Sequence, residues 1–515
     1  MAASSAARFP RNDKRATTRT SISNLPTPKI VFSSHFDLVV IGAGSGGFGA
    51  ALAAARLGAE VLLVEKSDWL GGNASRCGVN TWEMGVGGTG IPFDLYKRLK
   101  KIPQALGVYS LRRHICWDDP ADGPVFPGAE ILIDHTKRYL DTLRQFGAPE
   151  NYSEKVFRQT HWHGVPFEPE IYSAEMEAML AETGHCTVWK NTAFTSVEVE
   201  GSQLRSLSLD NGQTVTADFY VDSTADILVA QKAGCATSLG QEPRALYDEP
   251  SAPREPTDQL NGATLIYRVS PTNDPGIEPL AADIPTECWW ADRFPVASCN
   301  QYPDGGFNIN SLPTIAGREV AELGYKAAYA ECERRIRAHW HHTQSVFPEF
   351  QNFRMTWIAP GLGVRAGPRL VGQYVLTEHD LDAGLTGQTH DDFITISDHS
   401  KDTHGADTGA QDPNLKQPYG VPYRSLLPSE IDNLAVACRG AGFSTIGASS
   451  CRLSRTMMQL GQAAGTAAAL AKQKQLTSFS DLPASDLQAS LTEQHVELTW
   501  PRSTELIAYL QNEDD

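Results

Sequence analysis

The stretch VVIGAGSGGFGAALAAARLGAEVLLVEK at residues 39–66 constrains the fold more than any other part of the sequence. An apolar run over residues 36–41 predicts a buried strand, and the glycines after it have G-x-G-x-x-G spacing, at Gly42, Gly44 and Gly47. Alanine-rich residues 50–57 predict a helix, and the apolar segment VLLV predicts a second strand. Glycines at this spacing permit a tight turn and let a pyrophosphate approach bare backbone at the helix N-terminus. The stretch therefore predicts a βαβ unit that binds a nucleotide.

Glu65 ends the second predicted strand, roughly 20 residues after the first glycine of the turn. An acidic side chain at this place typically holds the two hydroxyl groups of a ribose, and it repels a 2′-phosphate. The same turn serves NAD, NADP and FAD, and a βαβ unit with a glycine-rich turn can also be purely structural. This stretch alone therefore leaves the nucleotide open.

Composition limits the size, the partners and the compartment of the protein. The chain has 515 residues, enough for two or more domains, and a formal net charge of −17, which disfavours nucleic acid and anionic membranes as partners. No run of 18 apolar residues exists, so no membrane span is expected. The nine cysteines include no CxxC pair, which suits a reducing compartment and disfavours a disulfide framework. We expect a soluble, intracellular protein without a metal site.

The beginning of the chain differs from the rest. Residues 1–34 contain six Lys and Arg, one acidic residue and many Ser and Thr. A segment rich in Ser and Arg and poor in acids is typical of an organelle transit peptide, and the alternative is a disordered tail. We therefore predict a disordered or targeting tail over residues 1–35. The expected location is the cytoplasm or, if the tail is a transit peptide, an organelle.

Two later segments have patterns that fit the same nucleotide domain. Residues 175–240 predict a helix and a strand meander with DNG as a hairpin turn, and residues 415–475 predict a strand, a Gly/Ser-rich loop and an Ala-rich helix. We therefore predict a discontinuous nucleotide domain with an inserted α+β substrate domain. The predicted boundaries are 36–115, 175–240 and 415–475 for the nucleotide domain, 116–174 and 241–414 for the substrate or cap domain, and 476–515 for a C-terminal helical segment.

Five segments in this order resemble one protein family: VVIGAGSGGFGAALAAARLGAEVLLVEKSDWLGGNAS, YVDSTADILVAQKAG, GVRAGPRLVGQYVLTEHDL, VPYRSLLPSEIDNLAVACRGAG and CRLSRTMMQLGQAAGTAAALA. They are similar to the FAD-dependent oxidoreductases with a glutathione-reductase-like nucleotide domain. The resemblance extends from about residue 37 to residue 471, and its third, fourth and fifth segments are more specific than the first. It implies an α/β fold with a Rossmann-like FAD-binding domain of glutathione-reductase type, and FAD as the cofactor.

The resemblance also implies where FAD lies. The three glycines of the turn would hold the pyrophosphate, Glu65 the adenosine ribose and the segment LGGNAS the ribityl chain. The loop over 75–81 would pass beside the isoalloxazine ring, the strand over 192–197 would lie near the adenine, and a helix N-terminus with Arg452 would stabilise negative charge at the pyrimidine edge. The expected FAD contacts are Gly42, Gly44, Gly47, Glu65, Lys66, Gly71, Gly72, Asn73, Cys77, Asp226, Arg439 and Arg452. Two residues depart from the family pattern, because the family usually has glycine at Ala225 and Cys438.

Several candidates for chemistry lie outside the glycine-rich turn. Cys77, in the loop beside the expected flavin, is either a small packed residue or a redox or covalent attachment site. His161 and His163 point the same way if their segment is extended, so they form either a proton relay over the flavin or an ordinary polar pair. Arg365 either binds an anionic or polyhydroxyl substrate or braces a domain junction. The HWHH segment at 339–342 falls in an Arg-rich helix and is expected on a solvated face.

The function predicted from these features is that of an FAD-dependent oxidoreductase. It would transfer a hydride from a small organic substrate, an alcohol, an amine or an activated C–H compound, to N5 of FAD, and oxygen or another acceptor would reoxidise the flavin. No second GxGxxG follows in the chain, which favours an oxidase or acceptor-linked dehydrogenase over an NADPH-fed reductase. The expected catalytic residues are His163, Arg365 and Arg452. The alternatives are a redox-neutral lyase or isomerase, and a flavin-bound scaffold without turnover.

Overall fold

The computed structural model describes residues 34–83, 85–106, 109–111, 138–142, 162–284, 297–302, 304–311, 313–403 and 413–514. The predicted tail over 1–35 therefore lies almost wholly outside the described residues, as does most of the predicted insertion at 116–174. The described residues all belong to one compact unit, Ser33–Asp515.

The glycine-rich stretch folds as expected into a strand, a helix and a second strand: β1 (Ser34–Ile41), α1 (Ser45–Arg56) and β2 (Val61–Val64). β1 and β2 pair in parallel, and every residue of β2 is buried. Gly58 has a φ of +83° just after the end of α1, a conformation that glycine adopts without strain. The local prediction of a βαβ unit is confirmed.

β1 lies within a seven-stranded sheet of the order β6-β2-β1-β9-β8-β7, and β18 pairs with the end of β9. β6, β2, β1, β9 and β18 are parallel, whereas β7 and β8 form an antiparallel meander that the predicted DNG turn joins to β9. The added strands are β6 (Cys186–Trp189), β7 (Phe194–Glu200), β8 (Gln203–Leu209), β9 (Thr214–Asp222) and β18 (Leu434–Val436). This sheet confirms the predicted α/β class with a Rossmann-like unit. The exact domain boundaries stay predictions.

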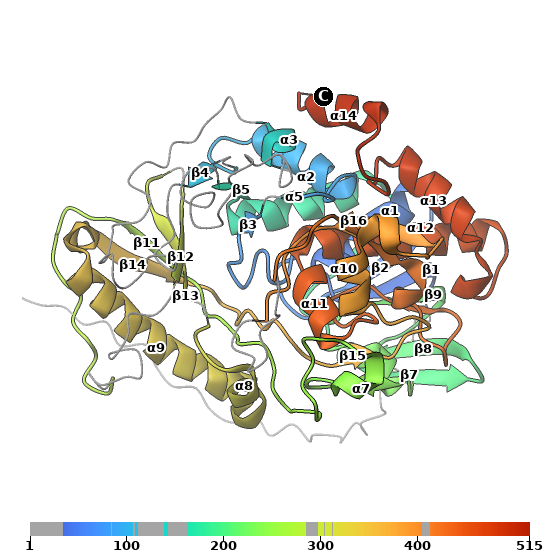
Figure 1. Ribbon diagram of the computed structural model, residues 1–515, viewed down its shortest axis with the longest axis horizontal. Helices are drawn as coiled ribbons and strands as arrows, with labels where there is room; N and C mark the ends of the chain where they lie inside the picture. Colours follow the sequence, from blue (N-terminus) through green and yellow to red (C-terminus); the bar gives the residue numbers. More distant parts are fainter. Residues whose placement is uncertain are drawn as a thin grey trace, which may run out of the picture. The chain divides into compact units, whose positions relative to one another are not determined.

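Helix α1 packs against α12 (Ser454–Gln473), the long Ala-rich helix near the C-terminus (Figure 1). Their backbones approach so closely that a Cβ on Gly461 would lie 1.8 Å from the carbonyl oxygen of Gly46. A Cβ on Gly465 would lie 2.0 Å from the carbonyl oxygen of Ala50. Glycine is therefore required where the two helices cross, and this packing joins segments from opposite ends of the described chain.

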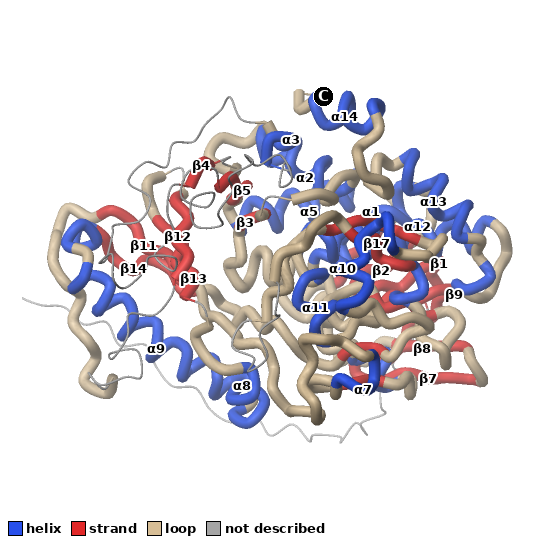
Figure 2. The backbone as a smooth tube through the Cα atoms, viewed as in Figure 1, coloured by secondary structure: helices blue, strands red, loops and turns tan. Residues whose placement is uncertain are grey.

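A second buried cluster is built from an antiparallel sheet of the order β12-β13-β11-β14 and helix α9 (Tyr325–Val346) (Figure 2). Its strands are β11 (Tyr267–Pro271), β12 (Ala297–Gln301), β13 (Phe307–Ser311) and β14 (Phe353–Ile358). His339 and Trp340 of α9 are buried, and Nδ1 of His339 lies 2.6 Å from the hydroxyl oxygen of Tyr267. The expectation of a solvated HWHH face is therefore wrong for these two residues, because this side of the Arg-rich helix packs against β11.

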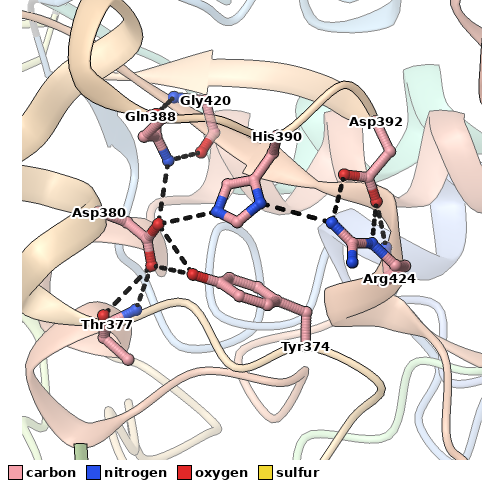
Figure 3. A network of polar contacts seen from close by, with 8 residues as sticks. All are labelled: Tyr374, Thr377, Asp380, Gln388, His390, Asp392, Gly420 and Arg424. Atoms are coloured by element: carbon pink, nitrogen blue, oxygen red, sulfur yellow. Dashed lines mark hydrogen bonds and ion pairs between the residues drawn. The ribbon is translucent and has the colours of Figure 1, made fainter.

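A polar network braces the N-terminus of α10 (Glu378–Gly387) (Figure 3). Asp380 accepts hydrogen bonds from the Tyr374 hydroxyl at 2.8 Å and from the Thr377 N–H at 2.9 Å. Nε2 of His390 lies 3.1 Å from the same carboxylate, and Arg424 pairs with Asp392 at 3.0 Å. The network supplies hydrogen-bond partners to the backbone at the start of α10. None of its residues lines the cavity described below, so we assign it a structural role.

The remaining described elements are smaller sheets, further helices and short 3₁₀ helices. β3, β5 and β4 form a small sheet, and β10 pairs with β15 and β16 with β17. The strands are β3 (Thr81–Trp82), β4 (Tyr109–Leu111), β5 (Trp162–Pro166), β10 (Thr237–Ser238), β15 (Arg369–Leu370), β16 (Phe393–Ser397) and β17 (Tyr419–Pro422). The helices are α2 (Ile91–Lys100), α3 (Tyr139–Thr142), α5 (Pro169–Glu182), α6 (Leu228–Lys232), α7 (Arg244–Tyr247), α8 (Gly317–Leu323), α11 (Thr445–Cys451), α13 (Ala484–Glu493) and α14 (Thr504–Gln511). Short 3₁₀ helices are η4 (Pro348–Asn352), η5 (Tyr423–Leu426) and η6 (Phe479–Asp481).

Candidate functional site

A cavity of about 1100 Å³ lies at the carboxyl ends of β1, β2 and β9, where Ile41, Val64 and Ser223 line it. Ligands of open α/β sheets bind in the crevice outside these strand ends. Residues from several distant segments complete the lining, within 65–83, 191–194, 361–365, 399–402 and 452–457. The cavity therefore extends from the glycine turn to Leu362 and Val364, which pack in the second buried cluster.

The glycine turn presents bare backbone to this cavity. Gly42 has a φ of +92°, and a Cβ on it would lie 2.6 Å from the carbonyl oxygen of Ser223. A Cβ on Gly47 would lie 1.8 Å from the carbonyl oxygen of Gly42, so this glycine serves the packing of turn and helix and does not line the cavity. A Cβ on Gly44 would meet no atom within 4 Å, and Gly44 is the N-cap of α1 without a side-chain cap. The turn thus leaves space and N–H donors for an anionic group.

Glu65 lines the cavity beside this turn, and its carboxylate is held in place. Its two oxygens accept hydrogen bonds from the N–H groups of Ala43 and Ser67, each at 2.8 Å. The side chain is nearly buried, and Lys66 and residues 191–194 line the same end of the cavity. A fixed carboxylate with further lone pairs can accept hydrogen bonds from sugar hydroxyl groups.

The double-glycine segment packs directly against the glycine turn. The Gly71 N–H donates to the carbonyl of Ala43 at 2.7 Å, and a Cβ on Gly72 would lie 3.1 Å from Cα of Gly44. Gly72 and Asn73 line the cavity, whereas Gly71 does not. The double-glycine segment therefore lies next to the glycine turn, as expected if both contact the same extended ligand.

The two departures from the family pattern are accommodated next to an ion pair. Arg439 pairs with Asp226 at 2.9 Å and donates to the carbonyl of Ala225. Cys438 is buried, its thiol donates to the carbonyl of Thr224 at 3.1 Å, and burial raises its pKa to about 12. All five of these residues line the cavity, so side chains replace the usual glycines without closing it.

The start of α12 faces the cavity with a cluster of cations. Leu453, its N-cap, and Ser454 and Arg455, its first residues, line the cavity. Arg452, the C-cap of α11, donates to the carboxylate of Asp402 at 3.1 Å and also lines the cavity. A helix N-terminus and arginines at one wall favour negative charge in the space before them.

Arg365 lies at the same end of the cavity. Its Nη1 donates to the carbonyl of Gly262 at 3.0 Å and to the hydroxyl of Thr264 at 2.6 Å. Burial and then the charge of Arg452 lower the pKa of Arg365 to about 9. The structure thus brings Arg365 and Arg452 together, although 86 residues separate them in the sequence.

Sequence reasoning missed a histidine and a glutamate that lie next to each other in the cavity wall. Nε2 of His399 lies 3.2 Å from Oε2 of Glu83, and both residues line the cavity. Burial lowers the pKa of His399, but the hydrogen bond and the charge of Glu83 outweigh it and raise the pKa overall. The available signal was the polar run DHSKD at 398–402, directly after the apolar strand β16.

The structure describes the side chain of Cys77 but not that of His163. The Cys77 thiol is buried at the cavity, donates to the carbonyl of Leu362 at 3.4 Å, and has a pKa raised to about 12 by burial. His163 belongs to β5, where its backbone pairs with Ser110, and its side chain lies outside the described part of the structure. His161 lies outside the described residues altogether. The predicted histidine relay therefore stays a prediction.

Sequence comparison decides the family. The family model described as FAD dependent oxidoreductase matches residues 37–491. The chain belongs to this family. It is an FAD-dependent oxidoreductase with FAD as its cofactor, and the cavity has the backbone cradle and the fixed carboxylate that FAD requires. No helix in the described ranges has the length and apolar character to cross a membrane.

Individual relatives of this FAD-dependent oxidoreductase are distant. Over 115 residues the chain is 30% identical to a fumarate reductase (cytochrome) from Shewanella frigidimarina, a match that covers 22% of this chain and only 18% of the relative. A geranylgeranyl bacteriochlorophyll reductase-like protein from Thermoplasma acidophilum matches with 13% identity and a TM-score of 0.43, over 94% of this chain and 97% of the other. L-proline dehydrogenase from P. horikoshii matches with 15% identity and a TM-score of 0.40, over 88% and 96% of the two chains. These likenesses add nothing to the family assignment.

Proposed function

We propose that this flavoenzyme takes a hydride from a small organic substrate, an alcohol, an amine or an activated C–H compound, and that oxygen or another electron acceptor reoxidises the flavin. One observation carries the proposal: a single cavity runs from Glu65 past the glycine turn to a distal end lined by Glu83, His399 and Arg365. A cavity of about 1100 Å³ exceeds the usual size of a single small-molecule site, so it has room for an extended cofactor with a small substrate beside it.

The residues expected to hold FAD are proposed to act along this cavity. Bound FAD supplies the redox chemistry by accepting a hydride at N5. Glu65 accepts from the adenosine ribose, Gly44 admits the pyrophosphate at the start of α1, and Gly72 and Asn73 flank the ribityl chain. The start of α12 and Arg452 stabilise negative charge at the pyrimidine edge. Lys66, Asp226 and Arg439, which line the same cavity, are further proposed FAD contacts.

The proton that leaves the substrate is proposed to go to Glu83. Its side chain is 40% exposed at the cavity, and His399 holds one of its two oxygens at 3.2 Å. Removal of a hydride from a C–H group requires a base for the partner O–H or N–H proton, and a fixed carboxylate provides one. Nδ1 of His399 is buried without a hydrogen-bond partner in the described ranges, so the carboxylate is the accessible member of the pair. His163 is the second candidate base, on the evidence of its sequence position alone.

Anaerobic bleaching tests the proposed function. The purified protein with bound FAD is mixed under argon with panels of alcohols, amines and activated C–H compounds while the visible flavin absorption is followed. We expect at least one class to bleach the flavin, and readmitted oxygen or an added acceptor to restore its colour. A protein that converts a substrate without bleaching and without acceptor consumption would instead be a redox-neutral flavoenzyme.

A further inference from the structure

Arg365 lines the cavity and forms no ion pair among the described residues. The charges of Asp402 and Glu83 raise its pKa, but burial and the charge of Arg452 outweigh them and lower the pKa overall. One nitrogen, Nη1, is held by Gly262 and Thr264. The N–H groups on Nε and Nη2 have no hydrogen-bond partner in the part of the chain that the structure describes. A half-buried guanidinium with one edge anchored and the other edge unused is a preformed donor pair.

The nearby acidic side chains are already paired with other cations. Asp402 accepts from Arg452 at 3.1 Å, and Glu83 lies 3.2 Å from the ring of His399. Lys401, also on the cavity wall, pairs with Glu378 at 3.1 Å and Asp382 at 2.7 Å.

The distal end of the cavity therefore holds more basic than acidic groups, in a chain whose formal net charge is −17. The basic residues of this lining are Arg365, Lys401, Arg452 and Arg455, of which Lys401 is neutralised by its two carboxylate partners outside the lining. The acidic residues that line the same end are Glu83 and Asp402. Two guanidinium groups that repel each other are stabilised when an anion binds between them or next to them.

We propose that Arg365 binds a carboxylate group of the substrate, with Arg452 adding to the positive potential, so that the substrate class is small organic acids that carry an oxidisable C–H. This inference rests on the proposed function, because it names the substrate of that same site. A planar guanidinium edge matches a carboxylate in two parallel hydrogen bonds, which a neutral alcohol or amine cannot form.

The site also orients such a substrate. A carboxylate fixed at Arg365 places the rest of a small molecule in the same cavity end as Glu83, the proposed proton acceptor. The hydroxyl of Thr264 holds Arg365 at 2.6 Å, so Thr264 is a positioning residue for the carboxylate.

Binding of benzoate and of its neutral, equally shaped amide, benzamide, tests this proposal. Both are titrated into the FAD-loaded protein while the visible flavin spectrum reports binding. We expect Arg365→Met to weaken benzoate binding by about tenfold or more, the loss of hydrogen bonds to a charged group, and to leave benzamide binding within about twofold. Arg205→Met is the matched control, because Arg205 is exposed, pairs with Glu200 at 3.0 Å and lies outside the cavity lining, yet loses the same charge.

A conservative variant distinguishes loss of the carboxylate site from a folding defect. Arg365→Lys keeps the charge and an anchor but loses the planar donor pair, so we expect benzoate binding between those of the wild type and Arg365→Met. The proposal is overturned if the wild type gives no benzoate response, if neither substitution at Arg365 weakens benzoate more than benzamide, or if Arg205→Met weakens it equally. Loss of bound FAD in both Arg365 variants also overturns it, because the arginine then serves the cofactor.

The binding titration and the bleaching experiment test the carboxylate site and the proposed function independently. Benzoate binding that depends on Arg365, without bleaching by any organic acid, alcohol or amine, contradicts the proposed function and leaves the carboxylate site standing. Bleaching by neutral substrates alone, unaffected by Arg365→Met, supports the proposed function and contradicts the carboxylate site.

Discussion

Nε2 of His399 lies 3.2 Å from Oε2 of Glu83, across a sequence separation of 316 residues. Glu83 follows the short strand β3, and His399 follows β16, so two different sheets bring the pair to one cavity. The imidazole lies against one carboxylate oxygen of Glu83, and both residues line the cavity. This pairing is the structural basis for assigning the substrate proton to Glu83.

Glu83→Gln is expected to slow anaerobic flavin reduction by a substrate by roughly 10²–10⁴-fold, the usual contribution of a general base. The amide oxygen can still accept from His399, so the flavin spectrum and FAD content should stay as in the wild type. Stopped-flow absorbance under argon measures the rate. Flavin reduction at the wild-type rate in this variant would show that another residue is the base, and His163 is the next candidate.

Gly44 and Gly46 are expected to respond oppositely to alanine. A Cβ on Gly46 would lie 1.8 Å from the carbonyl oxygen of Ala437, so Gly46→Ala should lower the free energy of unfolding by about 1–3 kcal/mol or more. A Cβ on Gly44 meets no protein atom within 4 Å, so Gly44→Ala should leave the apoprotein folded and fill space meant for the pyrophosphate.

Thermal melts of the apoproteins and titration with FAD separate the two glycine variants. Gly44→Ala should weaken FAD binding by roughly tenfold or more while the apoprotein melts near the wild-type temperature. Equal FAD affinity in Gly44→Ala and the wild type would show that the pyrophosphate does not lie against this residue.

Asp398→Asn is expected to stabilise the protein in a pH-dependent way. Burial raises the pKa of Asp398 to about 7 from 3.8, while the Val86 N–H at 3.0 Å and Arg455 act in the opposite direction. Between these two pKa values the folded protein keeps a proton that the unfolded chain has released, so the wild-type free energy of unfolding falls as the pH rises to about 7.

Asparagine cannot ionise, yet its amide oxygen can accept from Val86. The free energy of unfolding of Asp398→Asn should therefore exceed that of the wild type more at pH 8 than at pH 5, and urea titrations at the two pH values measure the difference. A constant offset at both pH values would mean that Asp398 does not titrate in this range.

FAD is expected to dissociate from the denatured protein. The Cys77 thiol is buried with a pKa raised to about 12, so it stays protonated near neutral pH and is a poor nucleophile toward a flavin. Acid precipitation should therefore leave the yellow colour in the supernatant. Colour in the pellet that disappears in Cys77→Ser would identify a covalent link at this residue instead.

Sequence reasoning succeeded where the geometry is local. The glycine spacing, the helix after it and Glu65 at the end of β2 all depend on a contiguous stretch, and the structure places each of them as expected. Glu83 and His399 were missed because no spacing rule links residues whose proximity depends on how two separate sheets pack.

His339 shows a different cause of error. The charged residues of α9 suggested a solvated helix, but Ala328, Cys332 and Ile336 lie on one face at intervals of four and lead to the buried His339 and Trp340. The apolar spacing was present in the sequence and outweighed the local charge, because burial follows the face of the helix and not its average composition.

The crossing of α1 with α12 has a consequence for how the protein is made. Gly46 and Gly461 touch through their backbones, and β18 completes the sheet beside β9, so residues from the last quarter of the chain form one wall of the nucleotide cavity. On a ribosome, the first βαβ unit emerges hundreds of residues before this wall exists. The cofactor can therefore be captured tightly only late in synthesis, and a truncated chain that keeps the glycine-rich stretch but lacks α12 should not retain FAD.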